Sequence, residues 1–329
     1  MGIDMGNGMV EALARSEFIF DSSADLTHEF EADPSWQESS VFAWNDLENG
    51  VSGFWRLGQE PVIGALNSSF GVSTLDGQRF RHNVTGVPMV VGDRGPTHMA
   101  HENKLRVDLD TLSITIDFPE CEARLQFTDF LPLFDYLNQV KREGGRGEIG
   151  HHIEMPGRLR GTMRIGDRDI KLDALAHRDR SWGPRDWSRV RATRWWPCVF
   201  GEDLSLHMLT VVDTNPVVMK VGYLYRDGVM KRIADLDCLV TIEADGVSAR
   251  SASGHILLED GEELDIAFTP HDSFMMFVRG YSANETMGTV RLGDRVGMSH
   301  LEICTNPSGG QNSVSVVVRA NNVDGLTRR

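Results

Sequence analysis

The chain has 329 residues, of which 40% are hydrophobic and 25% charged, a composition typical of a soluble globular protein with enough apolar material for a core. The formal net charge of −15 argues against nucleic acid or an anionic membrane surface as the main partner. No apolar run approaches the roughly 18 residues of a membrane span. The N-terminus also lacks a basic region followed by an apolar stretch, so we expect a cytoplasmic protein with no membrane span.

The length of the chain indicates its number of domains, and the spacing of its cysteines indicates their chemical state. A chain of this length exceeds one ordinary domain of ~150 residues, so we expect two domains. Residues 1–15 are expected to form a flexible N-terminus, with one short helix at residues 10–18. The four cysteines show no CxxC pairing, which favours buried free thiols over zinc ligands or disulfides.

Turn-forming dipeptides divide the first half of the chain into short segments that read as antiparallel strands. Asn49-Gly50 separates residues 40–44 from residues 51–57, and both turn positions tolerate the positive φ that a tight hairpin needs. Asp76-Gly77 and Gly166-Asp167 are further turns of this kind. The pattern predicts a run of hairpins.

The second half repeats this pattern. Asp227-Gly228, Asp245-Gly246 and Asp260-Gly261 separate further strand-like runs, and residues 313–319 read as a final strand. Many short strands with regular turns indicate an all-β protein built from antiparallel sandwiches or barrels. We expect the two domains to lie side by side, with an N-terminal β domain at residues 16–180 and a C-terminal β domain at residues 181–329.

Residues 177–187 carry the densest chemistry of the chain. The run His-Arg-Asp-Arg-Ser-Trp-Gly-Pro-Arg-Asp-Trp contains an imidazole, two carboxylates, three guanidiniums and two indoles. It falls where the two expected domains meet, and such junctions often hold ligand pockets.

This run, together with residues 152–162 and 166–172, resembles the AttH-like and carotenoid-hydratase-like superfamily, in a bacterial branch that carries an Arg-Asp-x-Ser-Trp-Gly-x-Arg motif. The shared core is an Asp followed three residues later by Trp-Gly, here Asp179, Trp182 and Gly183. The resemblance implies two lipocalin-like β domains. It also implies hydration, isomerisation or cyclisation, since the relatives include carotenoid hydratases, kievitone hydratase and fungal lipocalin-like pericyclases.

Asp179 is the first candidate for catalysis. A carboxylic acid in an apolar pocket can keep its proton near neutral pH and protonate an alkene or a tertiary alcohol, because burial disfavours the charged form. The alternative is a structural ion pair with one of the arginines in the same run, which would lower the pKa of the carboxyl group. Those arginines are Arg178, Arg180 and Arg185.

Four tryptophans lie between residues 182 and 196 and are candidates for substrate binding. An indole face stabilises a developing carbocation, by roughly 0.5–2 kcal/mol depending on desolvation. The alternative is ordinary core packing. The four are Trp182, Trp187, Trp195 and Trp196.

Histidines and one glutamate complete the candidate set. His177 could act as a base or orient Asp179, and His207 lies on an alternating strand. His300 and Glu302 share one strand face by the period of two, and Glu302 is the second candidate acid. The alternative for each histidine is a structural hydrogen bond.

The sequence predicts no metal and no organic cofactor. His151 and His152 on a strand point to opposite faces, so they cannot bind one ion together. His98 and His101 have a spacing that suits a metal on a helix, but their surroundings do not read as helical. Glycine-rich phosphate loops and the Gly-x-Ser-x-Gly motif are also absent from the sequence.

These observations favour an enzyme: a cofactor-independent hydratase, dehydratase (a hydro-lyase) or isomerase that uses acid catalysis. Its expected partner is a hydrophobic small molecule, isoprenoid-like (terpenoid) or polyene-like. The alternatives are a non-catalytic lipocalin-like carrier of an apolar ligand and a pericyclase-like cyclase that only folds its substrate. A homodimer stays open.

Overall fold

The structure is a computed structural model that describes residues 20–135, 150–214, 218–278, 281–305 and 323–328. The expected flexible N-terminus at residues 1–15, the short helix at residues 10–18 and the final strand at residues 313–319 lie outside these ranges.

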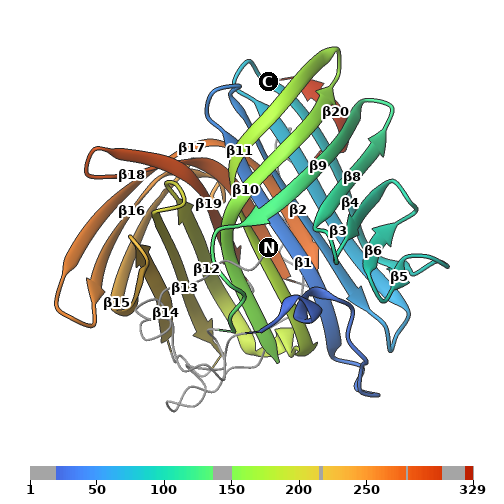
Figure 1. Cartoon of the computed structure of the whole chain (residues 1–329), viewed down its shortest axis with the longest axis horizontal. Helices are drawn as coiled ribbons and strands as arrows, with labels where there is room; N and C mark the ends of the chain where they lie inside the picture. The colour runs from blue at the N-terminus through green and yellow to red at the C-terminus, as the bar shows by residue number, and fades with distance from the viewer. Residues whose placement is uncertain (1–19, 136–149, 215–217, 279–280, 306–322, 329) are drawn as a thin grey trace.

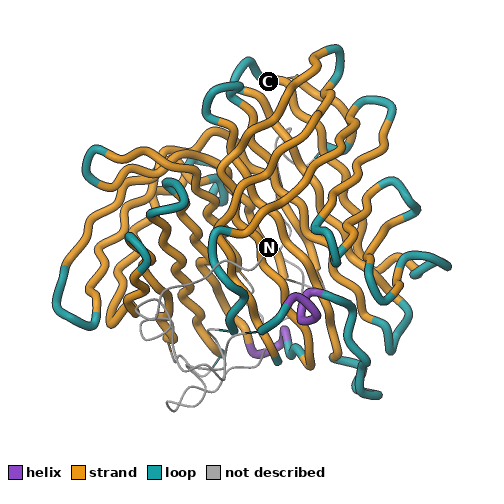
Figure 2. The backbone as a smooth tube through the Cα atoms, in the orientation of Figure 1, coloured by secondary structure: helices purple, strands orange, loops and turns teal. Residues whose placement is uncertain are grey.

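The described chain is almost entirely β, and it forms one large curled sheet beside one closed barrel (Figures 1 and 2). The expected all-β class, with two lipocalin-like β domains, is confirmed. The large sheet has twelve strands: β1 (Trp36–Asp46), β2 (Val51–Glu60), β3 (Ala65–Thr74), β4 (Gln78–Pro88), β5 (Arg94–Gly95), β6 (His98–His101), β7 (Leu105–Asp108), β8 (Ser113–Phe118), β9 (Cys121–Asp129), β10 (His151–Ile165), β11 (Arg168–Pro184) and β20 (Gly325–Arg328).

The barrel closes with eight antiparallel strands in chain order. These are β12 (Val190–Val199), β13 (Leu204–Asp213), β14 (Val218–Arg226), β15 (Val229–Ile242), β16 (Ala249–Leu258), β17 (Glu263–Val278), β18 (Tyr281–Leu292) and β19 (Arg295–Thr305). Two short 3-10 helices are η2 (Ser22–Asp25) and η3 (Trp187–Arg189). The expected division at residues 180 and 181 stays a prediction, while the sheets change over between Pro184 and Val190 and β20 pairs with β4 of the large sheet.

Hairpin turns set the register of the large sheet. Gly50 has φ +62° and ends the expected hairpin between β1 and β2. Gly166, with φ +58°, closes the hairpin between β10 and β11. Counting outward from this second turn, Glu154 pairs with Asp179 and His152 pairs with Ser181. The turn therefore decides which polar side chains become neighbours twelve residues or more away from it.

Alternate residues of β1 serve two different cores. Phe42 and Trp44 pack inside the curl of the large sheet, whereas Val41 and Ala43 belong to a cluster shared with the barrel. The barrel has its own interior core, which includes Trp196, Leu206, Phe268 and Leu301. The outer wall of the barrel thus packs on one face of the large sheet.

The large sheet and the barrel are also joined by an ion pair between β4 and β17 and by a close contact between β3 and β17. Arg79 on β4 donates from Nε to Asp272 Oδ2 on β17 at 2.6 Å, and both side chains are buried. The guanidinium lies 4.8 Å from the centre of the Phe274 ring. That ring packs against Gly71 of β3, where an added Cβ would lie 2.4 Å from it.

We predict that Gly71→Ala loosens this joint. The new methyl group must displace Phe274, so the free energy of unfolding should fall by about 1–3 kcal/mol. Urea denaturation would measure the loss. Phe274→Leu introduced into the Gly71→Ala protein should recover part of it, and an unchanged midpoint in Gly71→Ala would contradict the close approach.

Candidate functional site

The candidate site lies where β10 and β11 face the outer wall of the barrel. By strand alternation His152 and Glu154 share one face of β10, and His177 and Asp179 share the same face of β11. All four side chains are buried. The hairpin register brings the two pairs together, and β12, β13 and β14 of the barrel supply the remaining contacts.

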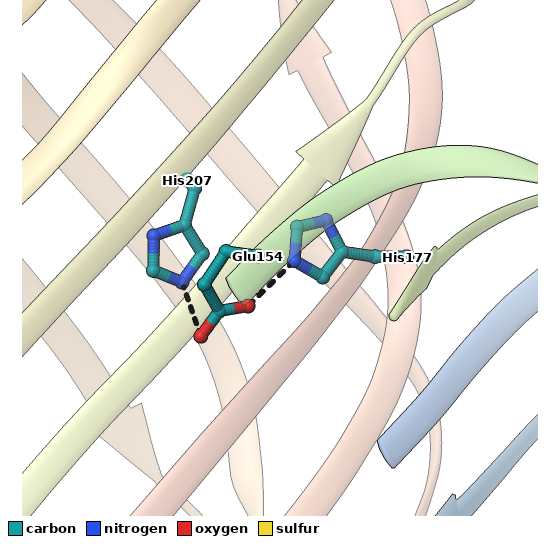
Figure 3. A group of neighbouring side chains, drawn as sticks. All are labelled: Glu154, His177 and His207. Carbon is teal, nitrogen blue, oxygen red and sulfur yellow. Dashed lines mark hydrogen bonds and ion pairs between the residues drawn. The ribbon is translucent and has the colours of Figure 1, made fainter. Parts of the chain in front are cut away.

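Glu154 is the centre of this network, and its side chain is completely buried. His177 Nε2 lies 2.7 Å from Glu154 Oε2, and His207 Nε2 of the barrel lies 3.3 Å from Glu154 Oε1 (Figure 3). Trp195, also of the barrel, donates from Nε1 to Oε1 at 2.7 Å. One carboxylate therefore joins the large sheet to the barrel.

His152 connects Glu154 to Asp179. Its Nε2 lies 2.8 Å from Glu154 Oε1 and 2.7 Å from Asp179 Oδ2. The side chain of Asp179 is 11% exposed, against 0% for Glu154 and 1% for His177. Asp179 is the member of the network nearest to solvent, and its buried Oδ1 has no hydrogen-bond partner among the described residues.

The neighbouring charges shift the pKa values in this network, and so decide which groups carry a proton at neutral pH. Burial opposes the charge on His152, but the negative charges of Asp179 and Glu154 outweigh it and raise the pKa of His152 to about 10. Burial likewise opposes ionisation of Glu154, yet His207 and His152 hold its pKa well below the usual value. Burial lowers the pKa of His177, which is neutral at pH 7. At neutral pH the network holds a buried imidazolium between two carboxylates.

Tyr223 of β14 closes the network on the barrel side. Its hydroxyl donates to the backbone carbonyl of Glu154 at 3.0 Å. Burial, followed by the charge of Glu154, raises the pKa of this phenol well above its usual value. Tyr223 therefore stays a hydrogen-bond donor across the working pH range.

The arginines of the same motif point the other way. Arg178 makes paired hydrogen bonds with Asp25, at 2.6 and 2.9 Å, and also binds Asp129. Arg180 binds Glu38 and the backbone carbonyls of Asp25 and Leu26. These contacts hold the η2 segment against the large sheet. The side chain of Asp179 binds His152, whereas Arg178 and Arg180 bind other carboxylates.

Of the four candidate tryptophans, the structure brings only Trp195 into the network. Trp196 points into the barrel, where Nε1 donates to Ser299 Oγ at 2.8 Å. Trp182 lies on the arginine face of β11, stacked between His28 and His151 at 3.9 and 4.7 Å between ring centroids. Trp187 lies in η3 under the guanidinium of Arg185. Because neighbouring residues of a strand point to opposite faces, tryptophans that are close in sequence lie in different surroundings. Their closeness in sequence therefore does not give all four one role.

The remaining candidates lie on the outer wall of the barrel. His207 stacks on His177 with 5.5 Å between ring centroids. His300 and Glu302 share one face of β19, as expected, but they do not meet: His300 Nε2 lies 2.8 Å from Glu285 Oε2, and Thr193 donates to Glu302. The catalytic role of Glu302 stays a prediction.

Sequence analysis missed several residues of the network. His152 and Glu154 carry the same period-two signal as His300 and Glu302, and the Gly166 turn would have placed Glu154 opposite Asp179. Tyr223 left no comparable local signal, because it meets the backbone carbonyl of Glu154 only when the barrel docks. His151 and His152 do point to opposite faces, as expected.

Two sets of side chains have donor atoms close enough for an ion, all within 4.8 Å of one another. One is Glu154, His177 and His207, and the other is His152, Glu154 and Asp179. Trp195 and His152 both approach Glu154 Oε1, so an ion bound there would displace their hydrogen bonds.

Comparison with known proteins places the chain in a family. A family model described as a domain of unknown function, DUF7064, matches residues 21–307. The chain belongs to this family. No curated protein sequence matches it.

Several solved structures share the fold of this chain. CghA aligns with a TM-score of 0.60 at 12% identity, over 85% of this chain and 90% of CghA, and CghA has also been solved with Sch210972. A candidate AttH from Nitrosomonas europaea aligns with a TM-score of 0.60 at 12% identity, over 89% of this chain and 98% of its own. Kievitone hydratase from Nectria haematococca aligns with a TM-score of 0.55 at 8% identity, over 88% and 94%.

At these identities the likeness shows the fold alone, and it confirms the fold part of the expected resemblance. In the described part of the chain, no helix has the length and apolar character that crossing a bilayer requires.

We predict that the charge state of His152 is visible in the pH dependence of stability. Its pKa in the folded protein, about 10, exceeds the ordinary 6.5, so its contribution to the free energy of unfolding is complete below pH 6.5 and is lost as the pH rises towards 10. Asp179→Asn removes one of the two negative charges that raise this pKa. Urea denaturation at several pH values should therefore show a smaller alkaline loss in Asp179→Asn than in the wild type; parallel curves would contradict this.

We also predict that Arg178 is structural. Arg178→Met leaves Asp25 and Asp129 without their cation, and breaking a buried ion pair in this way should lower the free energy of unfolding by about 3–5 kcal/mol. Thermal unfolding followed by circular dichroism would measure it. Arg124→Met, at an exposed pair with Asp117, serves as the control and should change stability little. Equal midpoints for the two variants would contradict the assignment.

Proposed function

We propose that this protein is a cofactor-independent hydro-lyase or isomerase that moves protons on a hydrophobic, isoprenoid- or polyene-like small molecule. The observation that carries the proposal is the buried imidazolium of His152 between Asp179 and Glu154. Buried ionisable groups with shifted pKa values are concentrated at functional sites, and a placed acid–base pair is what proton transfer to a substrate needs.

In this proposal Asp179 exchanges the proton with the substrate. It is the most exposed carboxylate of the network, and one of its oxygens has no partner within the described protein. His152 holds the proton next to it, so Asp179 works as a base or relay rather than as the protonated acid expected from the sequence alone. Glu154 orients His152 and balances its charge, and His177 supports Glu154 from the same strand as Asp179.

Apolar side chains around the network suit a hydrophobic substrate. The cluster between the large sheet and the barrel includes Val41, Phe54, Met276 and Met287, together with Trp195. The Trp195 ring lies 5.6 Å from the ring of His177 and carries an electron-rich face. We assign Trp195, rather than the other three tryptophans, to stabilising positive charge on the substrate.

The fold neighbours support this reaction class without deciding it. Kievitone hydratase is by name a hydratase, and it shares the fold at 8% identity. Unrelated reactions recur on one fold, so the argument rests on the side chains of the network. A carrier and a pericyclase-like cyclase remain the alternatives that the test must separate.

Exchange of oxygen separates an enzyme from a carrier. Linalool, an allylic tertiary alcohol, would be incubated with the protein in water enriched in ¹⁸O and followed by mass spectrometry. Reversible loss and return of water places the label in the alcohol, so we expect exchange with the enzyme. Binding of linalool with no exchange from it, or from a panel of related alcohols, would indicate a carrier and overturn the proposal.

We predict that Asp179→Asn lowers the exchange rate by about 10²–10⁴-fold, the range typical of losing a general acid or base. Asp173→Asn is the matched control, because Asp173 lies on the same strand and pairs with Arg158 and Arg160 at the surface. Circular dichroism would check that both variants fold. Full exchange activity in Asp179→Asn would contradict the role of Asp179 in proton transfer.

A further inference from the structure

A second pair of buried ionisable groups lies on the barrel wall. Glu285 on β18 and His300 on β19 belong to neighbouring strands, and Glu285 Oε2 lies 2.8 Å from His300 Nε2. Both side chains are buried, at 0% and 1% exposed. Phe54 of the large sheet stacks on His300 with 4.9 Å between ring centroids, so the pair lies in the interface between sheet and barrel.

Each member of the pair has one polar atom without a protein partner. Glu285 Oε1 and His300 Nδ1 are buried and make no hydrogen bond within the described residues. Most buried polar atoms in proteins are hydrogen-bonded, and leaving one without a partner costs free energy. Two such atoms on adjacent side chains have the hydrogen-bonding capacity to bind an oxygen that both accepts and donates a hydrogen bond.

The charge states of the two groups differ from those of the Glu154 network. Burial raises the pKa of Glu285 to about 8, against an opposing effect of the Arg56 guanidinium. Burial lowers the pKa of His300 to about 3. At pH 7 the pair is a neutral carboxylic acid beside a neutral imidazole, an arrangement in which a carboxyl group can still give up a proton.

This arrangement lowers stability at neutral pH. In the unfolded chain Glu285 ionises above pH 4.5, so the free energy of unfolding falls as the pH rises from 4.5 towards 8. A purely structural pair of this kind could be replaced by apolar side chains without that loss. The loss is easier to explain if the acid has a chemical task.

One indole separates this pair from the Asp179 network. The Trp195 ring lies 5.5 Å from the ring of His300, and its Nε1 donates to Glu154. The Trp195 side chain therefore contacts one member of each cluster, His300 of the barrel pair and Glu154 of the Asp179 network.

We propose that Glu285 and His300 bind the departing hydroxyl group of the substrate and protonate it, as the acid that complements Asp179. This inference rests on the proposed function and narrows the substrate to a mostly apolar alcohol with a removable hydrogen on the neighbouring carbon. The stacked ring of Phe54 and the indole of Trp195 contact the hydrocarbon next to that oxygen.

The step balances without any co-reactant. Glu285 gives its proton to the hydroxyl oxygen, and the C–O bond breaks with its electron pair leaving on water. Asp179 takes a proton from the adjacent carbon, whose C–H electrons form the C=C bond. Proton exchange with water then returns Asp179 and Glu285 to their starting states, and the reverse sequence hydrates the alkene.

The test compares Glu285→Gln with the wild type in the linalool exchange assay and by infrared spectroscopy. Gln keeps the size of the side chain and a hydrogen bond to His300 but cannot supply the proton. We expect exchange to fall by about 10²-fold or more. We also expect the wild type to lose rate above pH 8, as Glu285 ionises, and Glu285→Gln to show no such loss. The infrared band of a protonated carboxylic acid at pH 7 should be present in the wild type and weaker in Glu285→Gln. Glu263→Gln, at an exposed position of β17, is the control and should match the wild type in both measurements.

The outcomes distinguish this inference from the proposed function. If Glu285→Gln exchanges label at the wild-type rate while Asp179→Asn does not, the role of Glu285 is overturned and the proposed function stands. An infrared spectrum that is identical in the wild type and Glu285→Gln overturns the protonated acid whatever the activity. If the wild type exchanges no label from any alcohol, the proposed function fails and the inference fails with it.

Discussion

The buried carboxylate of Glu154 is the constraint on which the arrangement of this protein depends. It accepts hydrogen bonds from the large sheet through His177 and from the barrel through Trp195. A buried charge without such partners would cost several kcal/mol, so the barrel must dock where its indole N–H reaches this oxygen. Tyr223 adds a bond to the backbone carbonyl of the same residue. The contacts that join the two bodies are therefore the contacts that build the candidate site.

Because side chains alternate between the two faces of a strand, one short segment of β11 contributes to two different sets of contacts. Arg178 and Arg180 face one side of the sheet, where both bind Asp25 of the η2 segment. His177 and Asp179 face the barrel and join the Glu154 network. A dense run of opposite charges in sequence is thus divided by the sheet into a structural face and a chemical face, and the guanidiniums are kept away from the carboxylate that would otherwise pair with them.

Groups buried in the same interface keep different protonation states, and the nearest charges decide which. His152 holds its proton because two carboxylates flank it, and Glu154 stays ionised because imidazoles surround it. Glu285 has only the Arg56 guanidinium to favour its charge, so burial dominates and the acid keeps its proton. Acid–base chemistry at neutral pH uses pairs of groups whose pKa values are shifted in opposite directions in this way.

The sequence by itself determined the local features: the all-β class and the hairpins at Gly50 and Gly166. These follow from turn chemistry and the period of two, which act over a few residues. Only the tertiary structure decided that Trp195 rather than Trp196 joins the site, and that Tyr223 and Glu285 belong beside it. Trp195 and Tyr223 find their partner, Glu154, on the other sheet. The pKa of Glu285 depends on burial against Phe54 of the large sheet and its neighbours, which exists only after the barrel has docked.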